Sequence, residues 1–200
     1  MIKKYHYLLF TFIICGAVIF AGCSGSSSTE TEEETSNPEV SYKEAHGAVI
    51  MSTAEEEQQN DMYTKANDVT YLYWLDNLKT HLKNRTKCNI YAMNVIFKAG
   101  FKTPDVNVLT YDLADTSKFT DILPVVGISD PESARKGDLI AWNGHVIIFD
   151  YLVRIKKTIY AIAWWSGTGQ KDNGDNVINN VCHGKYKLNG YYVVRRPVKK

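Results

Sequence analysis

A cysteine and a histidine occur in this sequence in settings where a thiol and an imidazole could act together. The apolar residues after Cys88 recur on one face as far as Gly100, which predicts a helix that begins near Cys88. Unpaired backbone amides at a helix start stabilise a thiolate, and a nearby imidazole can accept the thiol proton. The same amides could form part of an oxyanion hole, so the chemistry indicated is nucleophilic attack on a carbonyl carbon.

His145 is the histidine whose position the sequence defines best. Four histidines follow the N-terminal apolar segment: His46, His81, His145 and His183. Asn143-Gly144 separates the apolar runs 138–142 and 145–149. Asn-Gly is the favoured two-residue hairpin turn, because both central residues must adopt positive φ. His145 is therefore predicted to begin the second strand and is our candidate base.

The rest of the domain must supply the elements that position these two residues. Ser52 and Thr53 precede an acidic run at 55–57, which predicts a helix start there. Apolar residues at spacings of three and four predict a second helix across 71–82: Tyr71, Trp74, Leu75, Leu78 and Leu82. Residues 100–138 lack periodicity and contain Pro104, Pro124 and Pro131, so loops with short ordered pieces are expected.

Strand signals follow in the C-terminal half of the chain. Besides the hairpin, residues 158–165 and 191–196 are rich in aromatic and β-branched side chains, which predicts two more strands. Helices followed by an antiparallel sheet define an α+β fold.

Two segments together resemble a known family. TKCNIYAMNVIFKAGF (86–101) is similar to the nucleophile helix of the NlpC/P60 and CHAP cell-wall hydrolases, and ARKGDLIAWNGHVIIFDY (134–151) is similar to their Gly-Asp strand and the Gly-His-Val strand after it. The resemblance spans about 70–166 and keeps the family's order of helix Cys before sheet His. It implies a papain-like α+β fold, with a helical N-terminal half packed on an antiparallel sheet. It also implies a cofactor-free endopeptidase or amidase that cleaves amide bonds of peptidoglycan stem peptides, with Cys88 as nucleophile and His145 as base.

The third polar residue of that family, which orients the histidine, is expected on the next strand. A turn at 155–157 would pair Arg154 with Thr158. Continuing that register places Gly167 opposite His145, with Ser166 one residue away. Ser166 is our candidate, because its hydroxyl can accept a hydrogen bond from the imidazole, although it lacks the charge that stabilises an imidazolium.

Three tryptophans are candidate substrate-binding residues: Trp142, Trp164 and Trp165. Large aromatic residues along a sheet mostly pack in the core. Because successive side chains point to opposite faces, one of Trp164 and Trp165 is expected outside the core. The outer one could wall a groove for sugar or stem peptide.

Three other interpretations of these residues remain open. An exported protein can keep disulfides, and a Cys88–Cys182 bond would stabilise the domain by roughly 2–4 kcal/mol and remove the nucleophile. Cys88, His145, Cys182 and His183 could instead hold zinc, although the usual close cysteine pair is missing. In the third interpretation the domain is inactive and binds cell wall or a protein partner.

The N-terminal residues predict export. Lys3 and Lys4 precede an apolar run at 8–21, which indicates a signal peptide over 1–22. Phe20-Ala21-Gly22-Cys23 resembles the lipobox of bacterial lipoproteins, which implies a lipid on Cys23 and a domain anchored to a bacterial membrane, by our expectation the outer one, facing the periplasm or the surface. The alternative is a plain cleavable signal. Residues 23–39 then form the lipidated cysteine and a flexible acidic tether, and 40–200 the catalytic domain.

Composition and charge exclude two classes of protein. The chain is 44% hydrophobic and 22% charged, which is ordinary for a globular protein and excludes a wholly disordered one. Residues 40–200 carry 21 basic and 17 acidic side chains without the Lys and Arg clusters of a nucleic-acid binder. No nucleic-acid partner is therefore expected.

Overall fold

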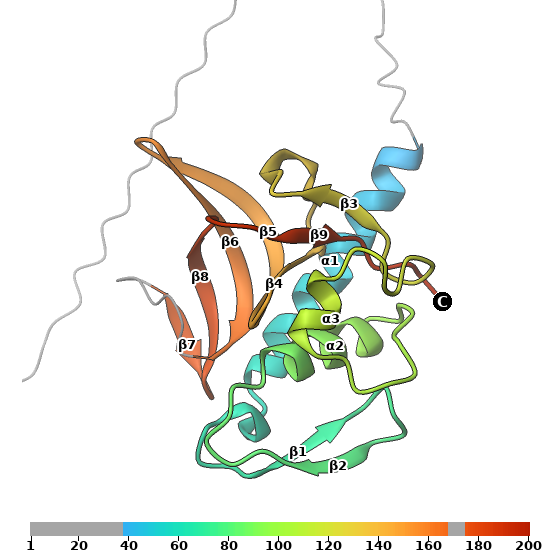
Figure 1. Ribbon diagram of the computed structural model, residues 1–200, viewed down its shortest axis with the longest axis vertical. Coiled ribbons are helices and arrows are strands. Elements are labelled where there is room, and N and C mark those ends of the chain that lie inside the picture. The colour runs from blue at the N-terminus through green and yellow to red at the C-terminus, as the bar shows by residue number, and fades with distance from the viewer. Residues whose placement is uncertain (1–37, 168–174) are drawn as a thin grey trace, which may run out of the picture. The chain divides into compact units, whose positions relative to one another are not determined.

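Helices pack against one face of a large antiparallel sheet, as Figure 1 shows. The computed structural model describes residues 38–167 and 175–200. The predicted signal peptide, Cys23 and tether residues 24–37 lie outside the described residues. The α+β class is confirmed, and the first helix begins at Pro38, so the last two residues of the predicted tether belong to it.

The described residues form three α-helices, two 3-10 turns and nine strands. The helices are α1 (Pro38–Gln58), α2 (Cys88–Lys98) and α3 (Thr110–Ala114), and the 3-10 turns are η1 (Asp61–Tyr63) and η2 (Pro131–Ser133). The strands are β1 (Val69–Leu72), β2 (Leu78–His81), β3 (Val125–Ile128), β4 (Leu139–Trp142), β5 (His145–Ile155), β6 (Thr158–Ser166), β7 (Asn176–Ile178), β8 (Val181–Lys187) and β9 (Val193–Arg195). The large sheet has the strand order β3-β9-β4-β5-β6-β8-β7, while β1 and β2 form a separate ribbon.

Both faces of the large sheet are buried. On the helix side, Val146, Ile148 and Trp164 join a core with α1 and α2. On the other side, Ile147 and Trp165 join a second core with residues of β8 and β9. The sheet is strongly curved in Figure 1, so strands far apart in its order close over this second face.

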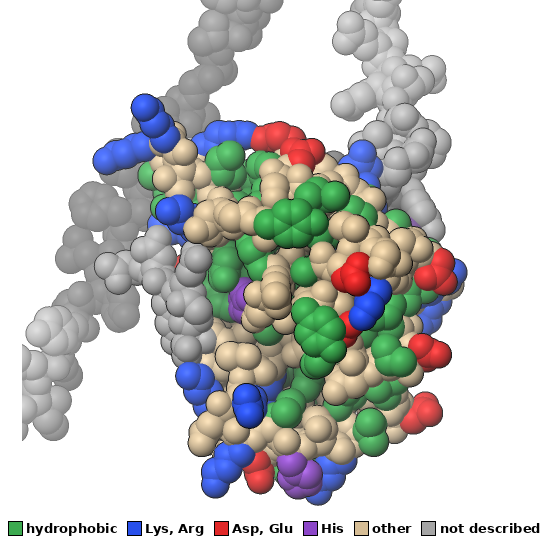
Figure 2. Space-filling model, in the orientation of Figure 1, with side chains coloured by type: hydrophobic (Ala, Val, Ile, Leu, Met, Phe, Trp, Pro, Cys, Tyr) green, Lys and Arg blue, Asp and Glu red, His purple; other side chains and the backbone are tan. Residues whose placement is uncertain are grey.

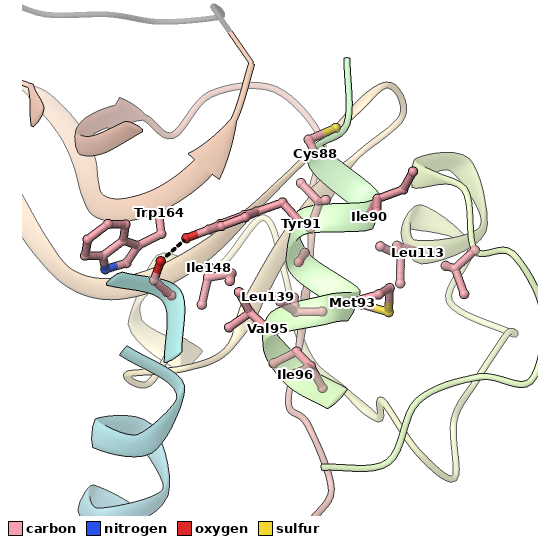
Figure 3. Packing of buried hydrophobic residues seen from close by; sticks show 14 of the residues in the cluster. Cys88, Ile90, Tyr91, Met93, Val95, Ile96, Leu113, Leu139, Ile148 and Trp164 are labelled. Carbon is pink, nitrogen blue, oxygen red and sulfur yellow. Dashed lines mark hydrogen bonds between the residues drawn. The ribbon is translucent and has the colours of Figure 1, made fainter. Parts of the chain in front are cut away.

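Helix α2 is the central element of the helix-side core and begins at Cys88, as predicted. Its buried side chains point into that core in Figure 3, and the Tyr91 hydroxyl donates a hydrogen bond of 2.7 Å to the Ala54 carbonyl of α1. The helix ends before Gly100, whose φ of +85° is the left-handed conformation that glycine adopts easily. Helix α2 is therefore held by its side chains in the helix-side core and by the hydrogen bond to α1.

The predicted helix start at Ser52 and Thr53 is wrong, because these residues lie within α1. Both hydroxyls donate to the Val49 carbonyl inside the helix instead of capping a new one. The acidic run lies in the last turns of α1, where Glu57 accepts a hydrogen bond from the Tyr63 hydroxyl and pairs with Lys98 at 2.6 Å. The position of Glu57 is therefore explained by its contacts with Tyr63 and Lys98 and not by a helix start. Among the helices of the described residues, none is long and apolar enough to cross a membrane.

The predicted helix across 71–82 is also wrong, because this segment is the β1–β2 ribbon. Asp76 and Asn77 have φ of +51° and +57°, and two successive left-handed residues end any right-handed helix. The Asn94 side chain of α2 accepts a hydrogen bond from the Tyr73 amide and donates one to the Tyr71 carbonyl. A buried partner from α2 thus overrides the helical spacing of the apolar residues.

The hairpin around Asn143-Gly144 is confirmed, with Trp142 paired to His145. Of the two central residues only Gly144 has a positive φ, at +109°, so the turn does not have the geometry we predicted. The two positive φ values expected of such a turn occur at Asn179 and Asn180, between β7 and β8.

The predicted pairing of β5 with β6 is wrong at the turn and right beyond it. Ile155 pairs with Thr158, one residue away from our prediction. A bulge between Phe149 and Tyr151 then shifts the register back, so that Ile148 pairs with Trp164. Continued to the strand ends, this register sets Gly167 opposite His145, as predicted. The bulge reverses the one-residue difference at the turn.

Candidate active site

Cys88 is the first residue of α2 and is 2% exposed. Its sulfur accepts hydrogen bonds from backbone amides of its own helix start, Cys88 and Asn89, and from the amide of Val146 in β5. Burial raises the pKa of the thiol more than these three amides lower it. In this state the thiol is protonated at neutral pH, and the amides are in place to stabilise negative charge on sulfur.

The same contact brings the start of β5 to the start of α2. Val146 follows His145 directly, so the hydrogen bond from its amide to the Cys88 sulfur places the His145 backbone beside the thiol. Cys88 and His145 are far apart along the chain, and the sheet and α2 bring them together in space. The two backbones are therefore adjacent, whereas the thiol lies in the helix-side core and the imidazole faces Tyr186 of the second core.

The imidazole of His145 is turned toward Tyr186. The two rings stack with centroids 5.1 Å apart and planes 18° apart. The Nε2 atom of His145 is buried and has no hydrogen-bond partner among the described residues. Burial lowers the pKa of His145 to about 4, so this imidazole is neutral at pH 7. The described residues therefore hold a neutral thiol and a neutral imidazole with no hydrogen bond between them.

Tyr186 of β8 is a site residue that the sequence did not indicate. Besides His145, its ring contacts Trp142 at 5.3 Å and Trp165 at 5.2 Å between centroids. Its pKa is raised to about 12, mainly by burial and further by the charge that Cys88 would carry as a thiolate. Tyr186 thus covers the imidazole and lies within electrostatic reach of the sulfur.

Ser166 does not orient His145 in this structure. Its hydroxyl is fully buried and has no hydrogen-bond partner among the described residues. Ser166 pairs with Val181, a residue of the helix-side core, whereas the His145 ring stacks on Tyr186 of the second core. Position 167, where the register sets the residue opposite His145, is a glycine and offers no side chain.

The expectation that one of Trp164 and Trp165 lies outside the core is wrong. Trp164 is 5% exposed on the helix side, and Trp165 is fully buried in the second core. The alternation of faces holds, but the curved sheet buries both of them. Trp142 is half-buried and is the tryptophan that reaches a surface groove, beside Tyr111 and Tyr191.

Lys87, directly before Cys88, holds the loop that leads into α2. Its side chain is fully buried, and the ammonium donates to the carbonyl oxygens of Met62, Thr64 and Asn67. These acceptors match the three donors of the group, while burial lowers the pKa of Lys87. We infer that Lys87 positions Cys88, although nothing in the local sequence indicated it.

Asp138 of the Gly-Asp motif supports the sheet rather than the site. Its carboxylate accepts two hydrogen bonds from the Arg196 guanidinium, at 2.8 and 3.1 Å, and one from the Arg135 amide at 2.8 Å. Burial raises the pKa of Asp138 despite these donors. The motif therefore fixes the beginning of β4, which leads to the turn before His145.

The disulfide interpretation is wrong, because Cys88 and Cys182 are both free and buried. They belong to the two cores on opposite faces of the sheet. The zinc interpretation fails for the same reason, since its ligands would have to meet across the sheet. Residues 38–167 and 175–200 contain no cluster of three or more His, Cys, Asp or Glu side chains that could hold a metal ion.

Comparisons with known proteins do not assign this chain to a family. No protein-family model, curated protein or solved structure matches it. The α+β class therefore follows from the observed helices and strands, and the candidate site from its own geometry.

Proposed function

We propose that this protein is a cysteine hydrolase of the NlpC/P60 and CHAP type, with a papain-like fold, that cleaves amide bonds in peptidoglycan stem peptides. Cys88 is the nucleophile and His145 the base. The observation that supports this most directly is the hydrogen bond from the Val146 amide to the Cys88 sulfur, which sets a helix-start thiol beside the residue next to His145. Helix-start cysteines with an adjacent imidazole are the arrangement that thiol hydrolases require.

The reaction would begin when the imidazole turns from Tyr186 toward the sulfur and takes the thiol proton. The thiolate attacks the amide carbonyl, and amides at the start of α2 stabilise the oxyanion. The protonated His145 then gives its proton to the departing amine as the carbon–nitrogen bond breaks, which leaves a thioester on Cys88. A water molecule, deprotonated by His145, attacks the thioester and releases the carboxylate and the free thiol.

Substrate binding has to uncover the pair in this mechanism. In the present structure Cys88 is covered and the pKa shifts of both groups favour the neutral forms. Displacing Tyr186 from the imidazole would expose His145 and raise its pKa toward the ordinary value, because burial is what lowers it. General-base catalysis is most efficient when the pKa of the base lies near the working pH.

The cellular setting of the proposal is export and lipid anchoring through Cys23 to a bacterial membrane. The tether would let the domain reach the wall while the lipid holds it at the membrane surface. Peptidoglycan stem peptides and the membrane are then the partners we propose.

A second candidate is an inactive domain that binds cell wall or a protein partner. Two observations favour it: the thiol is covered, and no polar side chain of the described residues is bonded to the Nε2 atom of His145. Such a domain would keep the fold of the hydrolase without its chemistry.

Release of new amino groups from purified peptidoglycan tests the two candidates. We expect the wild-type chain and Cys182→Ala to release amino groups, and Cys88→Ala to release none while keeping the wild-type circular dichroism. Cys182→Ala is the matched control, because Cys182 is also a free, buried cysteine but lies on the other face of the sheet. Wall material that is retained by the wild-type chain without any release would support the inactive domain, and equal release by Cys88→Ala would end the hydrolase proposal.

A further inference from the structure

One part of the large sheet lies away from the candidate active site and outside both cores. Beyond Ile148 and Trp164, the helix-side face continues along β5, β6 and β8, because paired residues share a face and every second residue of a strand returns to it. We call this surface the basic sheet face. It consists of Tyr151, Val153 and Ile155 of β5, Tyr160 and Ile162 of β6, and Lys185 and Lys187 of β8.

The apolar side chains of the basic sheet face are only partly covered. None of them belongs to either core of the described residues. Tyr151 and Ile155 are 52% and 41% exposed, and the other three are half-buried: Val153, Tyr160 and Ile162. Single exposed apolar residues are normal, but a contiguous row of them on two neighbouring strands is typical of an interaction surface.

The charge of this part of the chain is entirely positive. Residues 151–166 and β8 contain five basic residues and no acidic one: Arg154, Lys156, Lys157, Lys185 and Lys187. Lys156 and Lys157 form the turn of the β5–β6 hairpin, which extends beyond the other strands in Figure 1. Figure 2 shows Lys and Arg side chains projecting from the end of this hairpin, at the upper left.

The described acids beside this surface already have partners. Glu132 forms an ion pair with Arg154, and Asp150 forms one with Lys136 at 2.8 Å. Asp175 accepts a hydrogen bond of 3.1 Å from the backbone of β8. The surface therefore combines apolar side chains with an excess of positive charge.

We propose that the basic sheet face and the turn of its hairpin bind the surface of a bilayer that contains anionic lipids. Lysines near such a bilayer are attracted to its headgroups, and apolar side chains beside them enter the boundary between headgroups and acyl chains. The long stem of a lysine lets its ammonium stay at the phosphates while the apolar residues go deeper. Ile155, directly before the two lysines of the turn, is placed to make this apolar contact.

Other occupants fit this surface less well. A second copy of the chain would bring the same excess of positive charge against it. The acidic residues 24–37 of this chain include no large apolar side chain, so they could meet the lysines but not cover Ile155. An anionic wall polymer has the same shortcoming. Lysine is depleted at protein–protein interfaces, whereas four of these five bases are lysines.

This contact goes beyond the proposed hydrolase and does not require its chemistry. It would act together with the proposed lipid on Cys23. Residues 24–37 can take the start of α1 no further than about 50 Å from that lipid, because an extended residue spans about 3.5 Å. The anchored domain would therefore meet the bilayer at a high effective concentration, and even a weak contact would hold it in one orientation.

Sedimentation with lipid vesicles tests the proposal on the mature chain, 23–200, carrying Cys23→Ser so that no lipid contributes. We expect binding to vesicles of phosphatidylcholine and phosphatidylglycerol, little binding to phosphatidylcholine alone, and release in roughly 1 M salt, where charges are screened beyond about 3 Å. Lys157→Gln should weaken binding about fivefold, the effect of one lysine near an anionic surface. Ile155→Ser should weaken it about three- to tenfold.

Lys83→Gln and Leu78→Ser are the matched controls. Lys83 is an exposed lysine, and Leu78 is a 54% exposed leucine of the separate β1–β2 ribbon, so both variants should bind vesicles like the wild type. Cys88→Ala should also bind normally, so that loss of hydrolysis and loss of membrane binding are observed separately.

Equal binding to the two kinds of vesicle, or equal binding by Ile155→Ser and the wild type, would overturn the membrane proposal. Binding to soluble poly(glycerol phosphate) as tight as to vesicles, and unchanged in Ile155→Ser, would replace the bilayer with an anionic wall polymer. Self-association without vesicles that Ile155→Ser abolishes would replace it with a second copy of the chain.

Discussion

The burial of His145 gives the protein a pH-dependent stability. Its pKa is about 4 in the folded chain and 6.5 in an exposed histidine. Between these values the unfolded chain binds a proton that the folded chain does not, so the free energy of unfolding falls as the pH drops through this window and levels off below it. The loss is about 3 kcal/mol for a shift of this size.

His145→Gln isolates this contribution in urea titrations followed at several pH values. The variant lacks the titrating group, so its free energy of unfolding should fall less than that of the wild type between pH 6.5 and pH 4. Carboxylates that titrate in the same range affect both chains and cancel in the comparison. Parallel curves for the two chains would show that His145 is not buried as described.

The raised pKa and the burial of Cys88 both predict an unreactive thiol in the free protein. Near neutral pH, iodoacetamide should modify Cys88 at least roughly tenfold more slowly in the folded chain than in urea, because thiolate fraction and access are both reduced. Peptide mapping by mass spectrometry follows this one cysteine among the others. Rapid modification in the folded chain would contradict the covered site, and no modification in urea without reductant would restore the disulfide interpretation.

Lys87 should contribute strongly to the stability of the fold, although burying a charged ammonium is costly in itself. Lys87→Met leaves three carbonyl oxygens without their donor, and we expect a loss of about 2–4 kcal/mol in the free energy of unfolding, with faster iodoacetamide modification of Cys88. Lys83→Met is the control, because Lys83 is exposed. Equal stability of the two variants would mean that Lys87 does not hold the loop before α2.

Cys88 and His145 could be placed from the sequence because both depend on local signals. The helix-start signal lies within a few residues of Cys88, and the Asn-Gly turn directly precedes His145. Tyr186, Lys87 and Asn94 could not be found in this way. Their partners lie on distant segments, and their roles depend on the curvature of the sheet and on the loop at 62–67.

At the scale of the elements, the β4–β5 turn carries His145 and depends on one glycine. Gly144 has a φ of +109°, and no neighbouring atom lies within 4 Å of the place that a β-carbon would take. Gly144→Ala should therefore lose only the backbone strain energy, about 1–2 kcal/mol. Asn143→Ala is the matched control, because Asn143 does not have a positive φ and should lose much less. Thermal unfolding of both variants measures this, and equal losses would indicate the two-residue positive-φ turn that the sequence suggested.

The element predictions failed where tertiary partners overrode local spacing. The apolar residues of 71–82 have helical periodicity, but Asn94 binds the backbone of this segment and two left-handed residues turn it back as a ribbon. The acidic run at 55–57 resembles a helix start, but Glu57 accepts a hydrogen bond from Tyr63 and forms an ion pair with Lys98. Strands β3, β7 and β8 carried no signal strong enough to predict them, since they are short or interrupted by polar residues.

At the scale of the whole molecule, the curved sheet with two buried faces explains the arrangement of the site. The helix-side core fixes α2 and Cys88, while the second core holds Tyr186 and the ring of His145. The Cys88 thiol and the His145 ring thus belong to different cores, and the start of β5 is where their backbones meet. The sequence predicted the α+β class from helix and strand signals, but a second core cannot be seen in alternation alone, because alternation does not say what covers the outer face.

A mass-spectrometric map of the wall fragments released by the wild-type chain, Cys88→Ala and His145→Ala tests the central proposal most directly. Wild type should release fragments that all end at one kind of stem-peptide amide bond, and neither variant should release them. The same fragments from Cys88→Ala, or no fragments from the wild type, would contradict a thiol hydrolase built on these two residues.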